Sequence, residues 1–303
     1  MSSMKDKRII GIDIGGTNFR IGAVNTEGEV TQFRKIPVAE VFRTEDALKD
    51  LLSYLAAYRV GTAEEIAAVS IGFPATINRE RTRVLQAPNL AFMENLPVVL
   101  TLSQKLDVPV FIERDVTMVL QYDMIKYGIP WEGITCGFYF GTGIGNAISI
   151  NGQPLIGKNG TAGELGHIPA DGSEIRCGCG NLGCMENLAG GKYLAHLCES
   201  VYSDTPVGDL FLRHGHDPLL LQFVDRMAQT VAAEINILDP DHVLLGGGVL
   251  NMRGFPVDML SERIYGHTRK PYPAENLELL YTADEGEKGV VGAAYYAAGK
   301  LRA

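Results

Sequence analysis

Three glycine-rich turns, each directly after an apolar run, are the first candidates for a ligand site in this sequence. They read Asp13-Ile14-Gly15-Gly16-Thr17-Asn18, Gly141-Thr142-Gly143-Ile144-Gly145 and Gly246-Gly247-Gly248. A glycine-lined backbone lets a polyphosphate approach closely, and its N–H groups can donate to phosphate oxygens together with the hydroxyls of Thr17 and Thr142. One such turn alone would be an ordinary hairpin. Three of them predict a nucleotide or phosphate site.

The segments around the first two turns indicate which kind of phosphate site this is. Strand-like runs flank each turn, at 8–12 and 19–24 and again at 137–140 and 146–150, so both turns are expected in β-hairpins. In the dinucleotide fingerprint the glycines open a helix, and in the Walker A motif a lysine precedes Ser or Thr. Neither pattern occurs here. We therefore predict a strand–loop–strand phosphate site that is used twice.

A second candidate site combines one histidine with three cysteines among glycines. The pattern is H-x9-C-x-C-x4-C, formed by His167, Cys177, Cys179 and Cys184. Three thiolates at ~2.3 Å and one imidazole at ~2.0–2.1 Å suit a tetrahedral zinc ion, and a site closed by four protein ligands is structural. The alternative is a group of reduced cysteines beside a histidine, but a glycine-rich segment is poorly suited to form part of a hydrophobic core. Cys136 and Cys198 are expected to be buried thiols.

A third group of side chains could bind a polyhydroxylated ligand and transfer a proton. It contains an amide, three carboxylates and an imidazole: Asn89, Asp115, Glu164, Glu186 and His167. Asp115 follows a predicted strand and precedes a predicted helix, where active sites of α/β sheets usually lie. The helix dipole there favours the ionised carboxylate that a general base requires. Asp115 could also be a plain helix N-cap, and the two roles are compatible.

The elements that must position these residues alternate between strands and helices. The expected order is a hairpin, a helix at 44–58 capped by Thr44, strands at 66–72 and 109–113, and a helix at 116–127. A hairpin begins again at 137, followed by the cysteine segment, a helix at 219–238, a strand at 242–245 and a helix at 288–301. This repetition predicts two α/β lobes with a cleft between them. The expected lobes are 1–117, with the helix at about 289–303 packing back on it, and 118–288.

Composition limits the class of protein and its partners. The chain has 303 residues, 46% of them hydrophobic, and a formal charge of −9, which argues against nucleic acid as a partner. No run approaches the ~20 apolar residues of a membrane span, and residues 1–8 lack the apolar stretch of a signal peptide. Five cysteines without a secretory signal fit a reducing compartment. We expect a cytoplasmic protein with no membrane partner.

Together these motifs resemble the ROK family of repressors, open reading frames and sugar kinases, over nearly the whole chain. The resemblance rests on the three glycine turns and on Gly72-Phe73-Pro74, Ala87-Pro88-Asn89-Leu90, Gly163-Glu164-Leu165-Gly166-His167 and the segment 177–186. It implies the two-lobed sugar kinase/Hsp70/actin-like fold, which is related to ribonuclease H. Because the first predicted strand begins at Arg8, no helix-turn-helix domain is expected before it. This favours an enzyme over a DNA-binding regulator.

The resemblance also implies a role for each motif. The first two turns would hold the ATP phosphates, the third the adenosine side, and Asp13 would help position Mg2+; the residues so assigned are Asp13, Gly15, Gly16, Thr17, Asn18, Gly141, Thr142, Gly143, Gly246, Gly247 and Gly248. Asp115 would be the catalytic base for a hexose 6-hydroxyl, within a sugar site made of Gly72, Ala75, Asn89, Arg114, Asp115, Glu164, His167 and Glu186. Family members commonly form dimers, so a homodimer is expected.

Two departures from the glucose-type pattern of the family bear on the sugar. Ala75 stands where Gly is common after Gly-x-Pro, and Arg114 replaces an amide in the usual Glu-Asn-Asp-Ala-Asn run. By the resemblance both positions border O3 and O4 of the sugar, where a longer cation should change which epimer fits. The combination resembles the D-allose kinase branch. The alternatives are a glucose, mannose or N-acetylhexosamine kinase and a sugar-sensing regulator without catalysis.

Overall fold

The computed structural model describes residues 7–302 except 63, 89 and 171, and its chain divides into two compact units. Unit 1 comprises Met1–Gly128, Ile156–Ala162 and Glu285–Ala303, and unit 2 comprises Ile129–Leu155 and Gly163–Asp284. The first division therefore lies 11 residues beyond the expected boundary at 117, because the helix that starts at Asp115 continues to Lys126 and packs on unit 1. The segment Ile156–Ala162 was also expected in the second lobe but belongs to unit 1.

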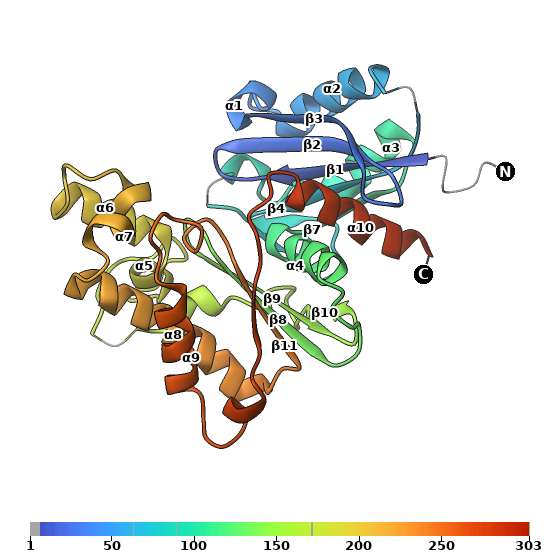
Figure 1. Ribbon diagram of the computed structural model, residues 1–303. Coiled ribbons are helices and arrows are strands. Elements are labelled where there is room, and N and C mark those ends of the chain that lie inside the picture. Colours follow the sequence, from blue (N-terminus) through green and yellow to red (C-terminus); the bar gives the residue numbers. More distant parts are fainter. Residues whose placement is uncertain (1–6, 63, 89, 171, 303) are drawn as a thin grey trace. The chain divides into compact units, whose positions relative to one another are not determined.

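Unit 1 is built on a five-stranded sheet in the order β3-β2-β1-β4-β7 (Figure 1). The strands β1, β2 and β3 are antiparallel, whereas β1, β4 and β7 run parallel, so the first hairpin is confirmed. The bounds of these strands are Lys7–Ile14 for β1, Asn18–Val24 for β2, Val30–Pro37 for β3, Glu65–Phe73 for β4 and Val110–Arg114 for β7. A separate two-stranded hairpin is formed by β5 (Thr76–Ile77) and β6 (Val84–Gln86).

Helices cover both faces of this sheet. One face packs on α2 (Ala47–Val60) and α3 (Val98–Leu106), with side chains such as Leu51 and Leu102 fully buried against the strands. The other face packs on α4 (Asp115–Lys126) and α10 (Lys288–Arg302). The last helix lies along β1 although the two come from opposite ends of the chain (Figure 1). A short helix, α1 (Val38–Val41), and a 3-10 turn, Ala91–Met93, complete the unit.

The helix α2 begins later than the sequence predicts. Its N-cap is Asp46, whose carboxylate accepts a hydrogen bond from the N–H of Lys49 at 3.0 Å, so the prediction of Thr44 as cap is wrong. Thr44 instead donates its hydroxyl to Asp50 inside the first turn of the helix. Thr and Asp are both good N-cap residues. Here the hydrogen bond to the Asp50 carboxylate holds Thr44 outside the helix, so Asp46 is the cap.

Unit 2 repeats the sheet pattern of unit 1. Its strand order is β10-β9-β8-β11-β12, with an antiparallel β8–β9 hairpin and parallel β8, β11 and β12. The strand bounds are Ile134–Phe140 for β8, Ile144–Ile150 for β9, Gln153–Pro154 for β10, His242–Gly246 for β11 and Leu279–Tyr281 for β12. The second hairpin is thereby confirmed, and so is the prediction that the second half starts the same order of elements again.

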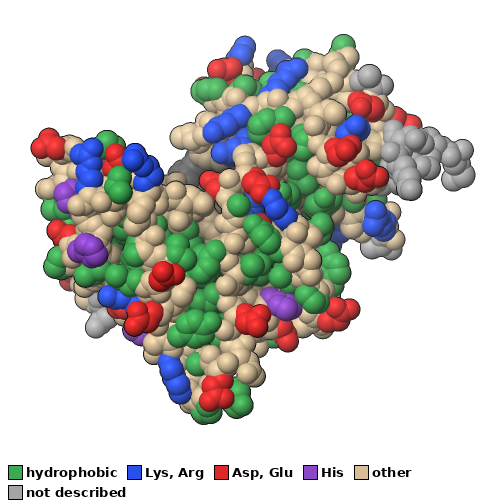
Figure 2. Space-filling view, viewed as in Figure 1, with side chains coloured by type: hydrophobic (Ala, Val, Ile, Leu, Met, Phe, Trp, Pro, Cys, Tyr) green, Lys and Arg blue, Asp and Glu red, His purple; other side chains and the backbone are tan. Residues whose placement is uncertain are grey.

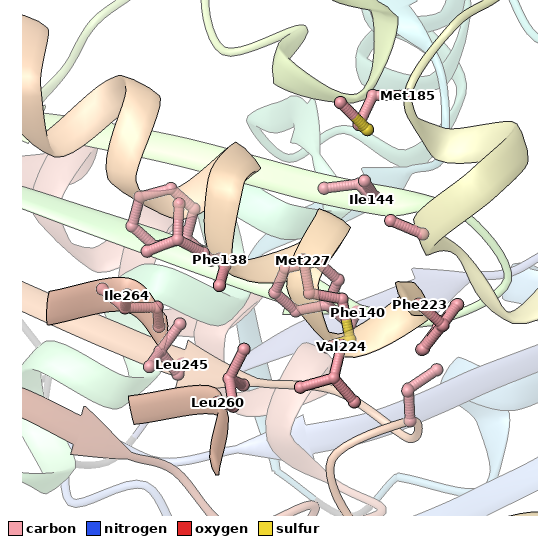
Figure 3. Close-up of a cluster of buried hydrophobic side chains, with 14 of the residues drawn as sticks. Phe138, Phe140, Ile144, Met185, Phe223, Val224, Met227, Leu245, Leu260 and Ile264 are labelled. Atoms are coloured by element: carbon pink, nitrogen blue, oxygen red, sulfur yellow. The ribbon is translucent and has the colours of Figure 1, made fainter. Parts of the chain in front are cut away.

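The core of unit 2 lies between its sheet and two helices. Phe138 and Phe140 of β8 and Leu245 of β11 pack against side chains of α8 (Pro218–Leu238) and α9 (Val257–His267), as Figure 3 shows. Shorter helices extend this core: α5 (Glu186–Ala189), α6 (Gly191–Ser200) and α7 (Leu210–His214). Among the described residues of the cysteine segment, between β10 and α5, the regular elements are the 3-10 turn Leu165–His167 and isolated bridges.

Candidate functional site

Parallel pairing in unit 1 brings the carboxyl ends of three strands to one edge of the sheet. Asp13 of β1 pairs with Gly72 of β4, and Gly72 pairs in turn with Glu113 of β7. A Cβ on Gly72 would lie 3.2 Å from the Cα of Asp115, so the missing side chain lets the start of α4 approach β4. The first glycine turn and the predicted base thus lie at the same edge, with one strand between them.

Asp13 is held by an ion pair at this edge. Its Oδ2 accepts a hydrogen bond from Nη1 of Arg20 at 2.9 Å, and Asp13 and Arg20 are directly opposite each other in the β1–β2 hairpin. Burial raises the pKa of Asp13, while the Arg20 guanidinium acts to lower it. Gly289 at the start of α10 leaves room for this carboxylate, because a Cβ there would lie 2.6 Å from Cγ of Asp13. Residues 15–18 form the turn itself, closed by the Gly15 N–H on the carbonyl of Asn18 at 2.8 Å.

Asp115 is the first residue of α4 rather than its N-cap. One of its carboxylate oxygens accepts the N–H of Val116 at 2.7 Å, so the backbone restricts the orientation of the side chain. Its neighbour Arg114 is buried and donates Nη1 to the carbonyl of Ala162 at 2.6 Å. Ala75 packs at the edge of the core of unit 1. Asn89, also expected at the sugar, lies outside the described residues.

In unit 2 the predicted metal ligands converge. The ligand atoms of His167, Cys177, Cys179 and Cys184 all lie within 4.8 Å of one another. Nδ1 of His167 lies 3.6 Å from Sγ of Cys177, and Sγ of Cys179 lies 3.6 Å from Sγ of Cys184. Thiolates ~2.3 Å from a tetrahedral zinc ion are about 3.8 Å apart, so the donor set and its spacing fit zinc. Left-handed Gly180 and Gly183 (φ 99° and 71°) let the chain turn back within seven residues.

The pKa values of the three thiols are shifted in different directions. Burial raises the pKa of Cys177, and it raises that of Cys184 to about 12. A hydrogen bond from the backbone of Asn181 lowers the pKa of Cys179. Packing thiolates together is costly unless a cation neutralises them, which is the charge that a divalent metal ion brings.

The predicted sugar ligands of unit 2 surround this cluster. Nε2 of His167 faces Glu164, with 3.5 Å to Oε2, while its Nδ1 faces Cys177. The carboxylate of Glu186 lies on the same side as the thiols, 3.4 Å from Sγ of Cys177. One ring nitrogen of His167 is therefore directed to the cysteines, and the other is directed to a carboxylate.

The second and third glycine turns are neighbours at one sheet edge of unit 2. Their strands β8 and β11 run parallel, and Gly246 pairs with Tyr139. Gly247 packs on the backbone of Phe140, because a Cβ there would lie 2.6 Å from its N and 2.7 Å from its C atom. The start of α6 donates two N–H groups to the second turn, from Gly191 to Gly141 at 2.8 Å and from Lys192 to Thr142 at 2.9 Å.

Several residues that contact the predicted site were missed by the sequence reasoning. Arg20 could have been found by counting across the first hairpin from Asp13, since the two face each other on adjacent strands. Gly289 had no local signal, because its partner is 276 residues earlier in the chain.

Lys and Arg side chains are scattered among Asp and Glu on the face shown in Figure 2.

Comparison with known proteins identifies the fold and the family. The ROK family model matches residues 9–300. The chain is 27% identical to the glucokinase of Thermotoga maritima, covering 96% of this chain and 97% of that protein, and 31% identical to the N-acetyl-D-glucosamine kinase of Pectobacterium carotovorum, covering 80% and 84%. The structure of a ROK glucokinase from Streptomyces griseus with glucose and AMPPNP superposes with a TM-score of 0.76 at 25% identity, covering 95% of this chain and 98% of that one.

These matches confirm the expected mixed α/β, actin-like fold. Among the described residues, every helix is too short or too polar to cross a membrane. The match covers the three glycine turns, the cysteine segment and the last helix up to residue 300. The chain belongs to the ROK family.

Proposed function

We propose that this protein is an ATP-dependent sugar kinase that transfers the γ-phosphoryl group to the 6-hydroxyl of a hexose. The observation that carries the proposal is the common sheet edge of unit 1, where a glycine turn bearing Asp13 and the carboxylate of Asp115 are separated by a single strand. Relatives named glucokinase and N-acetyl-D-glucosamine kinase support the same reaction class.

In this mechanism Asp115 accepts the proton of the attacking hydroxyl. The N–H of Val116 holds one of its carboxylate oxygens, which restricts the orientation of the side chain. A loose phosphoryl-transfer transition state requires the proton to leave only late, so an ordinary carboxylate is a sufficient base. Most of the rate enhancement then comes from positioning the two reactants.

The phosphate groups of ATP would be bound by the backbone N–H groups and threonine hydroxyls of the turns at 13–18 and 141–145, and the adenosine side by 246–248. Asp13, fixed by Arg20, would hold Mg2+, which when bound neutralises phosphate charge.

The cluster of His167, Cys177, Cys179 and Cys184 would hold one structural zinc ion, which supplies no chemistry to the transfer. Nδ1 of His167 faces the thiols, so this nitrogen would bind the metal and Nε2 would bond a sugar hydroxyl. Glu164 and Glu186 lie beside the same imidazole and would accept hydrogen bonds from further hydroxyls. Zinc would thus orient the sugar ligands of unit 2.

For the sugar itself we propose D-allose, on the motifs that contain Ala75 and Arg114. Glucose and N-acetylglucosamine are the competing substrates, since relatives carry those names. A panel of hexoses and N-acetylhexosamines with ATP, in which ADP release is measured by a coupled assay, tests both the kinase activity and the choice of sugar. D-allose should give the highest kcat/KM. A preference for another sugar would overturn the D-allose assignment alone, whereas sugar binding without any ADP release would indicate a sugar-sensing regulator.

A further inference from the structure

A largely buried arginine in the β5–β6 hairpin of unit 1 has no role in the mechanism above. Arg81 lies in the turn between the two strands with a left-handed backbone (φ 54°). Its side chain is 11% exposed and forms an ion pair with fully buried Glu113, from Nε to Oε2 at 2.8 Å. Burying such a pair costs desolvation energy that a well-packed apolar pair would avoid. A gain in stability therefore does not explain why Arg81 and Glu113 are paired here, whereas the hydrogen bonds of the guanidinium do suggest a role.

The guanidinium of Arg81 joins this hairpin to another part of the unit. Its Nη1 donates to the carbonyls of Ile77 at 3.0 Å and Asn78 at 3.2 Å, and also to that of Gly160 at 2.9 Å. Gly160 belongs to Ile156–Ala162, which we call the crossover segment because unit 2 precedes and follows it in the chain. Gly160 has φ 82° and packs on the hairpin so closely that a Cβ would lie 2.9 Å from the N of Arg79.

Glu113 extends this connection to the predicted base. Its Oε1 accepts the N–H of Arg114 at 2.9 Å, and its Oε2 accepts the hydroxyl of Tyr296 at 3.3 Å. Arg114 in turn donates Nη1 to the carbonyl of Ala162 at 2.6 Å. Two carbonyls of the crossover segment are thus bound by the side chains of Arg81 and Arg114. Glu113 accepts hydrogen bonds from both arginines, from the side chain of the first and the backbone N–H of the second. From these anchor points the chain continues directly to Asp115 in one direction and to Gly163-Glu164 in the other.

We propose that Arg81 is a positioning residue for phosphoryl transfer, acting through Glu113 and the crossover segment. It fixes the backbone at Arg114-Asp115 and the start of the chain that leads to Glu164. This inference rests on the proposed kinase function. An arginine is needed because Nε and Nη1 serve different acceptors in a fixed fork, which the single ammonium of a lysine cannot reproduce.

Kinetics of three variants test this role. Arg81→Ala should lower kcat about 10- to 100-fold, since a displacement of about 1 Å at the reacting groups can cost this much. The KM for ATP should stay within about twofold, and Arg81→Lys should recover only part of the loss. The matched control is Arg83→Ala, on the same turn, where an exposed arginine donates to the carbonyl of Asn95. A kcat for Arg81→Ala within twofold of the parent would overturn the proposal.

Hydrogen exchange separates this inference from the proposed function. Amides of residues 156–162 should exchange faster in Arg81→Ala than in the parent or in Arg83→Ala, whether or not a sugar substrate has been found. Unchanged exchange there would overturn the role of Arg81, whereas a parent protein inactive on every sugar would overturn only the kinase assignment. If circular dichroism shows Arg81→Ala to be unfolded, Glu113→Gln replaces it in both measurements, with the same expected direction and the same overturning results.

Discussion

The carboxylate of Glu186 occupies the space into which a side chain at residue 143 would extend, since a Cβ on Gly143 would lie 3.4 Å from its Cδ and closer still to Oε2. Glu186 begins α5, directly after the cysteine segment, and Gly143 lies in the second glycine turn. The predicted phosphate-binding turn and the predicted sugar-binding carboxylate are therefore in contact within unit 2. A glycine at residue 143 therefore also leaves room for the carboxylate of Glu186, in addition to letting the backbone approach a phosphate.

Gly143→Ala should impair sugar binding more than folding. The new methyl group meets the mobile end of Glu186 rather than backbone, so the carboxylate moves and the free energy of unfolding changes by less than about 1 kcal/mol. The KM for the sugar should rise about tenfold, as expected for one misplaced charge-assisted hydrogen bond. The comparison is Gly141→Ala, where no neighbouring atom lies within 4 Å. An equal rise of sugar KM in both variants would contradict the explanation.

Asp115→Asn should abolish turnover while retaining sugar binding. The amide keeps the size of the side chain and can still accept the N–H of Val116, but it cannot take a proton. We expect kcat to fall at least about 1,000-fold, with the sugar dissociation constant changed by a few fold, measured by ADP release and calorimetry. Asp107→Asn is the control, because Asp107 caps α3 in a left-handed conformation that asparagine also adopts. Near-normal turnover of Asp115→Asn would eliminate Asp115 as the base.

Metal analysis of the purified protein should find about one equivalent of zinc per chain. Cys179→Ser should lose the metal, lower the melting temperature and raise the sugar KM, because the ligands of the cluster also orient His167. Cys198→Ser, in α6 and outside the cluster, should keep metal and activity. A Cys179→Ser protein that retains both would refute the zinc site.

The acid stability of unit 2 should depend on Asp225. Its Oδ1 accepts hydrogen bonds from Nε2 of His267 at 2.9 Å and from Nη1 of Arg263 at 3.0 Å. Burial disfavours the ionised carboxylate, but these two bonds outweigh burial and lower its pKa below the ordinary 3.8. A depressed folded-state pKa stabilises the protein fully above the unfolded value, and this contribution is lost as the pH falls through the folded value.

The stability difference between the parent and Asp225→Asn should therefore be constant near neutral pH and shrink below about pH 4. Urea unfolding at a series of pH values measures it. A difference that stays the same down to about pH 2 would show that the carboxylate contributes through packing and not through its charge.

Local sequence patterns were sufficient for the elements that carry the predicted site. Apolar runs around the glycine turns predicted both hairpins, and the strand before Asp115 was found within one residue of its observed bounds. The cysteine spacing predicted a cluster that the structure brings together. These features are local, so neighbours in the sequence define them.

Contacts between distant segments could not be predicted in this way. Arg81 meets Gly160, 79 residues later, and Tyr296 meets Glu113 across 183 residues. A turn such as Asn78-Arg79-Glu80-Arg81 gives no sign of which arginine will be buried, because burial depends on what packs over the turn. For the same reason the composition of 156–162 did not show that it leaves unit 2 for unit 1.

The position of α10 has a consequence for the order in which the chain can fold on the ribosome. Val290, Val291 and Ala294 cover apolar side chains of β1, β2 and β4, which are synthesised more than 200 residues earlier. Unit 2 is complete once residue 284 has emerged, but in unit 1 the sheet face that α4 and α10 share stays partly uncovered until the last helix follows. A chain ending at residue 284 should therefore be cut by protease within 7–128 while 163–284 resists, and any chaperone that binds this nascent protein should recognise the apolar part of that sheet face which α4 leaves open.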